Sequence, residues 1–296
     1  MSNHKDVRVA LTFDYDAMSN WIGSTGAKSP GMISRGEFGP IGLKRILALL
    51  DARGIKSTFF VPGHTALAYP STVKAIRDAG HEIGHHGWVH ENPVTLSPER
   101  EREVLIRGFE ALQEVAGVHP VGYRSPGWDN SAATVPLLVE FGFEYESSLM
   151  GSDFEPYWCR VGDQFSQTEE FRWGQPVNLI EIPVAWHLDD FIQFEFVAMP
   201  TSLLMGLRST TTPWEIWRDE FDYLYGRVGS GIMNITMHPQ VIGRGHRMLF
   251  LERFIDYVAG HEGATFTTLG DYAREWRAGK TPSLPRDAGP ARARRD

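Results

Sequence analysis

The 296-residue sequence contains a single cysteine, Cys159, and this scarcity limits the chemistry available to the chain. One thiol excludes an intrachain disulfide and any zinc site built from several cysteines. No stretch approaches the roughly 18 apolar residues of a membrane-spanning helix. The first residues also lack the apolar stretch and cleavage site of a signal peptide. We therefore expect a cytoplasmic protein with no membrane partner.

The sequence also lacks an excess of basic residues and a glycine-rich phosphate-binding motif. Its 37 acidic residues outnumber 29 basic ones, which gives a formal net charge of −8. Nucleic-acid binding depends on clustered Lys and Arg, so no nucleic-acid partner is expected. Neither a GxGxxG nor a P-loop pattern is present, which argues against a nucleotide cofactor. With 42% hydrophobic residues, the composition is nevertheless that of a folded protein.

Strand-like apolar runs alternate with helical patterns along most of the chain, and several helical patterns end at a glycine. This rhythm predicts an α/β fold with a parallel sheet, either open or closed into a barrel. Residues 279–296, with three prolines and four arginines, are expected to form a disordered tail. We expect strands at 7–13, 57–61, 81–85, 121–124, 143–146, 179–184, 231–237 and 264–267, and helices at 40–53, 70–79, 97–116, 132–141, 214–228, 246–260 and 269–277.

Two long segments break the rhythm. Residues 16–39 are rich in glycine and serine, and residues 147–212 are rich in aromatic residues. We expect both to be irregular, apart from the strand at 179–184. Loops of this length in a compact domain are usually functional, so both segments are candidates for pocket walls.

Carboxylates and imidazoles follow the ends of three predicted strands: Asp14 and Asp16 the first, His86 and His90 the third, and His238 a later one. Catalytic groups collect at such ends in strand–helix proteins. Two imidazoles and one carboxylate leave coordination positions open for water and substrate, as in catalytic zinc sites. A His-x3-His pair alone favours structural histidines. The acidic pair at a strand end shifts the interpretation to a divalent metal centre.

His238, Arg124 and three tryptophans each have a functional and a structural interpretation. His238 can act as a general acid, or it can be a buried histidine hydrogen-bonded to backbone. Arg124 can hold a catalytic aspartate or a substrate oxygen with its two-pronged guanidinium, or it can belong to an ordinary turn. Trp21, Trp128 and Trp186 can line a pocket, although most aromatic side chains pack in the core.

Four segments, in this order along the chain, carry a family resemblance: Thr12–Asp16, His81–His90, Tyr123–Gly127 and Met237–Pro239. Together they resemble the motifs of the polysaccharide deacetylase superfamily. The resemblance extends over most of the chain and implies a distorted (β/α) barrel of seven or eight strands. It also implies that residues 1–278 form a single catalytic domain.

The resemblance implies a role for each matching residue. In the family's first motif one aspartate is the general base and the next is a metal ligand, which implies Asp14 as the base and Asp16 as the ligand. The remaining motifs imply two further metal ligands, a residue that positions the base, and a general acid; these are His86 and His90, Arg124, and His238.

Tyr15 separates the two aspartates, as in the branch of the superfamily that contains cyclic imide hydrolases, peptidoglycan-deacetylase-like proteins and allantoinase-like proteins. The allantoinase-like members work without a metal. The complete Asp, His, His set of this chain favours a bound divalent metal, with zinc as the expected ion. The segment Gly31–Phe38, which includes Arg35, looks most like the first two groups, and Trp186–Asp190 looks like a further loop motif of the branch.

We therefore expect a metal-dependent hydrolase of non-peptide C–N amide bonds that opens small cyclic imides or related ring amides. Trp21, Arg35, Trp128 and Trp186 are the expected substrate contacts. One alternative is an N-acetyl deacetylase of peptidoglycan or another polysaccharide. A second alternative, from a different class, is an inactive sugar-binding barrel. Because family members form oligomers, a homotetramer is expected.

Overall fold

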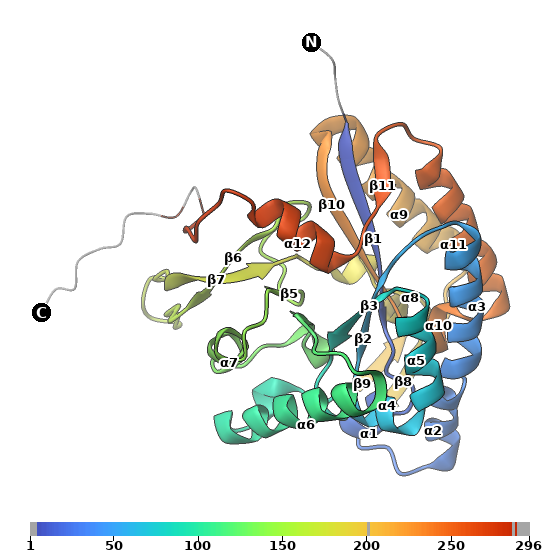
Figure 1. Ribbon diagram of the computed structural model, residues 1–296, viewed down its shortest axis with the longest axis horizontal. Helices are drawn as coiled ribbons and strands as arrows, with labels where there is room; N and C mark the ends of the chain where they lie inside the picture. The colour runs from blue at the N-terminus through green and yellow to red at the C-terminus, as the bar shows by residue number, and fades with distance from the viewer. Residues whose placement is uncertain (1–4, 200–201, 286–287, 289–296) are drawn as a thin grey trace, which may run out of the picture.

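The computed structural model describes residues 5–199, 202–285 and 288, and one curled sheet dominates this part of the chain (Figure 1). Eight of its strands are mutually parallel, which confirms the predicted distorted (β/α) barrel. The parallel strands, in their order across the sheet, are β10 (Ser230–Met237), β1 (Asp6–Asp14), β2 (Thr58–Val61), β3 (Glu82–His85), β4 (Gly122–Tyr123), β5 (Tyr145–Glu146) and β7 (Gln175–Glu181), with β11 (Ala264–Phe266) also paired to β1.

Helices connect these strands and cover the outside of the sheet. Figure 1 shows α3 and α11 side by side beyond β1, and α6 on the opposite side of the molecule. The main helices are α3 (Gly39–Ala52), α4 (Gly63–Ala68), α5 (Pro70–Asp78), α6 (Pro98–Ala116), α7 (Thr134–Glu140), α9 (Thr211–Tyr223), which continues into the π-helical turn η4 (Leu224–Val228), α10 (Pro239–Ile242), α11 (Gly245–Ala259) and α12 (Leu269–Arg277). Three short 3-10 turns lie at Pro93–Thr95 (η1), Pro126–Trp128 (η2) and Trp186–Leu188 (η3).

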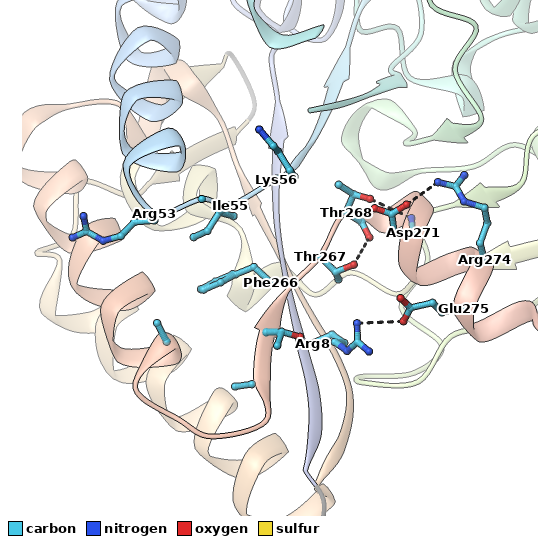
Figure 2. A pocket seen from close by; sticks show the side chains of 14 residues that line it. Arg8, Arg53, Ile55, Lys56, Phe266, Thr267, Thr268, Asp271, Arg274 and Glu275 are labelled. Atoms are coloured by element: carbon cyan, nitrogen blue, oxygen red, sulfur yellow. Dashed lines mark hydrogen bonds and ion pairs between the residues drawn. The ribbon is translucent and has the colours of Figure 1, made fainter. Parts of the chain in front are cut away.

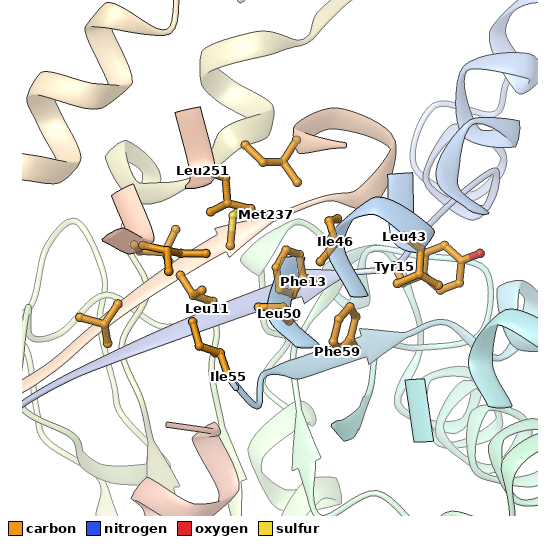
Figure 3. Packing of buried hydrophobic residues seen from close by; sticks show 14 of the residues in the cluster. Leu11, Phe13, Tyr15, Leu43, Ile46, Leu50, Ile55, Phe59, Met237 and Leu251 are labelled. Carbon is orange, nitrogen blue, oxygen red and sulfur yellow. The ribbon is translucent and has the colours of Figure 1, made fainter. Parts of the chain in front are cut away.

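The core between β1, β2 and α3 shows why the first strand could be predicted. Strand β1 is buried on both faces beyond its first residues, so it reads as a continuous apolar run rather than an alternating one. The Phe13 and Phe59 rings stack with centroids 4.8 Å apart (Figure 3). Leu43, Ile46 and Leu50 cover these rings from α3 and belong to the same buried cluster. This packing fixes the carboxyl end of β1, where Asp14 lies.

The barrel is distorted because β7 and β10 do not form a regular ladder with each other in the described residues. A single parallel bridge joins Asp189 to Thr236 across this seam. The Asn234 amide also donates to the Pro183 carbonyl at 3.1 Å. An antiparallel strand, β6 (Tyr157–Val161), extends the sheet beyond β7. The side chains at the seam are therefore held by individual hydrogen bonds instead of a continuous strand pairing.

The expectation of irregular structure in residues 16–39 and 147–212 is wrong. The first segment contains α1 (Ser19–Gly23) and α2 (Pro30–Glu37). The second contains the β6–β7 hairpin, α8 (Asp190–Phe194) and a two-stranded hairpin of β8 (Phe196–Met199) and β9 (Ser202–Met205). These elements are short and carry no apolar periodicity of their own. They form where the barrel gives them a surface to pack on.

Strand β1 pairs with β10 and β11, which come from the other end of the chain. The two ends of the chain therefore share one sheet, although the limits 1–278 of a single domain stay a prediction. Residues 279–285 contain no helix or strand, and most of the expected disordered tail lies outside the described residues. No helix among the described residues is long and apolar enough to span a membrane.

Candidate active site

Asp14 and Asp16 lie at the carboxyl end of β1, and both side chains are buried. The Asp14 carboxylate accepts a hydrogen bond of 2.9 Å from Nη1 of Arg124. Asp16 forms no such pair with an arginine of the described residues and faces three histidines instead. The two aspartates therefore differ in partner although they are separated by a single residue.

Several contacts besides the one with Asp14 fix the position of the Arg124 guanidinium. Its Nε donates to the Ser147 carbonyl at 2.9 Å and its Nη1 to Thr12 Oγ1 at 2.8 Å. The guanidinium also lies over the Phe60 ring, 4.3 Å from its centroid. Burial raises the pKa of Asp14, but the charges of Arg124, His86 and His238 outweigh burial and hold that pKa below its usual value. Asp14 is therefore an ionised carboxylate with a fixed orientation.

Asp16, His86 and His90 form a second cluster around one point. Nε2 of His86 lies 3.4 Å from Asp16 Oδ1, and Nε2 of His90 lies 3.7 Å from Asp16 Oδ2. One nitrogen or oxygen of each residue falls within 4.8 Å of the others, and all three side chains are buried. The structure thus brings together the three residues that the sequence predicts as metal ligands.

The far nitrogen of each imidazole is already engaged, which orients the near one. His86 Nδ1 donates to the Arg124 carbonyl at 2.7 Å. Ser24 Oγ lies 2.6 Å from His90 Nδ1 and also contacts the His90 carbonyl at 3.2 Å. Because a carbonyl only accepts, Ser24 donates to it and accepts from Nδ1. Both histidines therefore direct an unprotonated Nε2 toward Asp16, the arrangement typical of metal-bound imidazoles.

The unpartnered atoms of this cluster fit a divalent metal. Both carboxylate oxygens of Asp16 and Nε2 of His86 are buried and form no hydrogen bond with the described residues. Burial, together with the negative charges of Asp14 and Asp189, raises the pKa of Asp16 well above its usual value, although His238 acts in the opposite direction. Buried polar groups are normally paired, and a cation bound by these atoms would satisfy all three. Asp16, His86 and His90 are therefore a candidate metal-binding triad.

His238 follows β10 and faces both aspartates. Its Nε2 lies 3.7 Å from Asp16 Oδ2 and 4.0 Å from Asp14 Oδ2, and its Nδ1 lies 2.7 Å from Asp190 Oδ1. The backbone N–H of His238 also donates to the Asp190 carboxylate at 3.1 Å. Burial lowers the pKa of His238, but its hydrogen bond with Asp190 and the neighbouring carboxylates outweigh this effect and raise the pKa well above its usual value. His238 is thus held as a proton donor.

The four predicted substrate contacts form two pairs. The Arg35 guanidinium lies over the Trp21 ring at 4.3 Å and forms an ion pair with Glu195. Trp21 is buried, and its ring lies 6.0 Å from that of Phe191, which in turn lies 5.4 Å from the His238 ring. Trp128 and Trp186 contact each other with centroids 4.4 Å apart, and Trp186 remains 43% exposed. Their contact with a substrate stays a prediction.

Several residues of the site were not singled out from the sequence. Asp190 was recognised only as part of a loop motif, and Ser24 carried no signal because its contact with His90 spans 66 residues. Ser147, which holds Arg124, also looked like an ordinary loop residue. The double aspartate Asp189–Asp190 was the one available signal, since adjacent buried carboxylates need a cationic partner.

The amino-acid sequence is similar to those of a known protein family. A family model described as "Polysaccharide deacetylase" matches residues 2–145. A protein described as "Peptidoglycan deacetylase" from Helicobacter pylori is 36% identical, over 92% of this chain and 97% of its own length. The chain belongs to the polysaccharide deacetylase family. The four motifs follow β1, β3, β4 and β10, which are mutually parallel, so they meet at one end of the barrel.

Solved structures agree with this family assignment. A Mycobacterium smegmatis structure assigned to the polysaccharide deacetylases is 38% identical, with a TM-score of 0.83, and the match covers 97% of this chain and 96% of the other. The structure of an allantoinase is 25% identical, with a TM-score of 0.73, and covers 94% and 93% of the two chains. The chain is therefore a hydrolase of the deacetylase type, which acts on C–N amide bonds.

Proposed function

We propose that this deacetylase-family chain is a metal-dependent hydrolase that opens small cyclic imides or related ring amides. The observation that carries the proposal is the burial of the reacting groups. Asp14, Asp16 and His86 are at most 2% exposed, and His90 and His238 at most 7%. A polysaccharide needs a groove open at both ends, whereas a ring of five or six atoms needs only an enclosed site.

The elements that enclose the site come from the two long segments. Helix α1 lies against the His90 loop so closely that a Cβ at Gly23 would lie 1.8 Å from the Val89 carbonyl oxygen. The Arg35–Glu195 ion pair ties α2 to the segment after α8. These contacts hold both segments against the elements that carry His90 and Asp190, and this supports a compact substrate.

The chemistry follows from the partners of each side chain. A divalent metal held by Asp16, His86 and His90 would polarise the substrate carbonyl and acidify a bound water. Asp14, kept ionised by Arg124, takes the proton from the attacking water. His238, kept protonated by Asp190, gives a proton to the departing nitrogen. The base and the acid are separate side chains that both border the cluster, with Asp14 Oδ2 and His238 Nε2 4.0 Å apart, so each proton transfer has its own group.

A hydrolysis panel tests the proposal. Protein reconstituted with zinc is assayed on succinimide, maleimide, hydantoin, allantoin and N-acetylglucosamine oligomers. Ring substrates should be hydrolysed far faster than the oligomers. Activity that rises with the length of the sugar chain, with no turnover of any ring, would contradict the proposal.

The second candidate function is removal of N-acetyl groups from peptidoglycan or another polysaccharide. The names of the relatives favour it, since the Helicobacter pylori protein is described as a peptidoglycan deacetylase. Trp186 is 43% exposed and packs against Trp128 with the two rings tilted by 34°, so it also offers an apolar surface of the kind on which a sugar ring packs. Loss of deacetylation in Trp186→Ala, with ring hydrolysis unaffected, would support this candidate.

Three further expectations accompany the proposal. Zinc is proposed as the metal because two imidazoles and one carboxylate suit it. The cytoplasmic location and the homotetramer stay predictions. Elemental analysis of the purified protein and light scattering at micromolar concentration test the metal and the tetramer.

A further inference from the structure

Glu146 and Glu181 are two buried carboxyl groups for which the proposed mechanism has no use, and we call them the carboxyl pair. Glu146 ends β5 and Glu181 ends β7, and the two residues are direct partners in the register of these parallel strands (Figure 1). Both are fully buried. The backbone N–H of Ser148 donates to Glu146 Oε2 at 3.1 Å and to Glu181 Oε1 at 3.0 Å. The two carboxyl groups therefore lie close enough to share one donor.

Every hydrogen bond that the described residues donate to the carboxyl pair comes from a neutral group. Besides the Ser148 N–H, the donors are the Ser148 hydroxyl, the Leu149 N–H at 2.9 Å and the Cys159 thiol at 3.8 Å. Two neighbouring carboxylates inside a protein repel each other, and a proton bound by one of them relieves this repulsion. Burial, the negative charge of Glu146 and a hydrogen bond with Glu146 accordingly raise the pKa of Glu181 well above its usual value.

The ionisable groups around the carboxyl pair are neutral or already paired. Burial raises the pKa of the Cys159 thiol on β6 and of the Tyr157 and Tyr123 hydroxyls, so all three stay protonated at neutral pH. Arg160, also on β6, lies 2.8 Å from Asp163, which takes up its charge. The carboxyl pair therefore holds its own proton instead of relying on a neighbouring cation.

The loop that follows β5 connects the carboxyl pair to Arg124. The Ser147 carbonyl accepts from Arg124 Nε at 2.9 Å, and Ser147 Oγ accepts from Arg124 Nη2 at 3.0 Å. Ser148 Oγ accepts from the Ser125 N–H at 2.7 Å. The guanidinium of Arg124 and the backbone that follows it are therefore both attached to the two residues directly after Glu146.

We propose that the carboxyl pair shares one proton and, in this form, positions Arg124 and through it the base Asp14. With one proton, the acid donates to the carboxylate, and the remaining oxygens accept from Ser148 and Leu149. Arg124, held in this way by Ser147, donates to Asp14 at 2.9 Å. Without the proton, the two charges repel, and the loop loses the geometry that Arg124 requires. The two glutamates are thus positioning residues.

This inference rests on the part of the proposed function that makes Asp14 the general base. It does not depend on which amide is hydrolysed, because the base acts on water and not on the substrate. Ring amides and N-acetyl groups should therefore respond alike to changes in the carboxyl pair.

Variants of two buried glutamates test the positioning role by kinetics. Glu181→Gln replaces the acid by a neutral amide that can form the same hydrogen bonds, whereas Glu181→Met removes them. Glu101→Met is the matched control, since Glu101 is also buried and accepts from the Ser131 and Thr134 hydroxyls, both at 2.5 Å. We expect kcat to fall about 10-fold in Glu181→Met, with KM and zinc content unchanged. It should stay near the wild-type value in Glu181→Gln and in the control.

A milder variant applies if Glu181→Met does not fold. Ser148→Ala removes the hydroxyl that donates to Glu146 and accepts from the Ser125 N–H, but it keeps the backbone hydrogen bonds of the carboxyl pair. It should show the same fall in kcat with KM unchanged.

A second measurement counts the proton without turnover. Because the pKa of Glu181 is raised in the folded protein, folding takes up a proton at pH values between the ordinary carboxyl pKa of about 4.3 and the folded value. The stability from this group is present below the ordinary pKa and is lost as pH rises through the folded one. Denaturant unfolding at a series of pH values measures this uptake. Glu181→Gln should take up about one proton fewer than the wild type on folding, so its stability should fall less steeply with pH.

The outcomes separate the inference from the proposed function. Wild-type protein that hydrolyses no ring overturns the proposed substrate, and the variants are then compared on N-acetylglucosamine oligomers. Equal proton uptake in the wild type and Glu181→Gln overturns the shared proton. A wild-type kcat in Glu181→Met, or a kcat as low in Glu181→Gln as in Glu181→Met, overturns the positioning role. A fall in zinc content in Glu181→Met would mean that the carboxyl pair supports the metal ligands instead of the base, and this would also overturn the inference.

Discussion

At the amino-terminal end of β1, a cavity of about 770 Å³ is lined by several arginines, and each of them faces a carboxylate. Arg8 lies 3.2 Å from Glu275, and Arg274 lies 2.9 Å from Asp271 (Figure 2). At the carboxyl end of the same strand, Asp16 is buried and has no hydrogen-bond partner among the described residues. The arginines of the amino-terminal cavity are thus paired with carboxylates, whereas the Asp16 carboxylate at the other end of the strand has no hydrogen-bond partner in the part of the chain that the structure describes.

This difference shows which kind of feature marks a site. A cavity whose charges already neutralise one another offers little to a ligand, because binding would have to break existing ion pairs. Buried polar atoms without partners carry a desolvation cost that a bound cation or other ligand can offset. The chemistry of this chain therefore belongs at the carboxyl ends of the strands, as expected for a barrel of this kind.

The largest expected effect is the loss of the metal. His86→Ala and Asp16→Asn should each lower zinc content and reduce kcat/KM by ~1000-fold or more, since a bound metal supplies several kcal/mol to the reaction. Arg274→Met in the amino-terminal cavity is the control, and it should leave both the zinc content and kcat/KM unchanged. Elemental analysis and steady-state kinetics measure the two effects. Full activity in protein shown to be metal-free would contradict the prediction.

The next effect is loss of proton transfer with the metal retained. Asp14→Asn and His238→Ala should keep their zinc and lose activity by ~100-fold or more, the usual scale for removal of a general base or acid. The geometry gives the reason, since Asp14 pairs with Arg124 and only Asp16 faces both triad histidines. If Asp14→Asn loses the zinc and Asp16→Asn retains it, the proposed roles of the two aspartates are reversed.

The strand–helix rhythm predicted an α/β fold with a parallel sheet, and the family resemblance implied the barrel and the residues that converge at its carboxyl end. Apolar runs ended by glycines identified the main strands and helices. For example, Ser97 caps α6 with its side chain, and Gly117 ends that helix in the left-handed conformation. These signals are local, so one segment of sequence contains them in full.

The structural features that could not be predicted depend on contacts between residues that are far apart in the sequence. Helix α1 has five residues and becomes stable only where Gly23 lies against Val89 and Ser24 bonds His90. Asp190 orients His238 across 48 residues. Motifs therefore indicated the candidate reacting groups but not the residues that hold them in place.

A smaller effect concerns pH. Asp190 is one of the groups that raise the pKa of His238, so Asp190→Asn should lower that pKa. The general acid works only while protonated, and activity is lost as pH rises through its pKa. The alkaline limb of the pH–kcat profile should therefore move to lower pH in Asp190→Asn, while the acidic limb stays in place. An unchanged alkaline limb would mean that a group other than His238 is the acid.

The smallest effect is expected at the amino-terminal cavity. Arg8 pairs with Asp6 and Glu275, and all three side chains are partly exposed. Such pairs contribute ~0.2–1 kcal/mol each, because water screens the charges and holding the side chains costs entropy. Arg8→Met should therefore lower the melting temperature by only about 2 °C and leave kcat/KM unchanged. A tenfold fall in kcat/KM, or a melting temperature that inorganic phosphate raises in the wild type but not in Arg8→Met, would show that the satisfied cavity also binds a ligand.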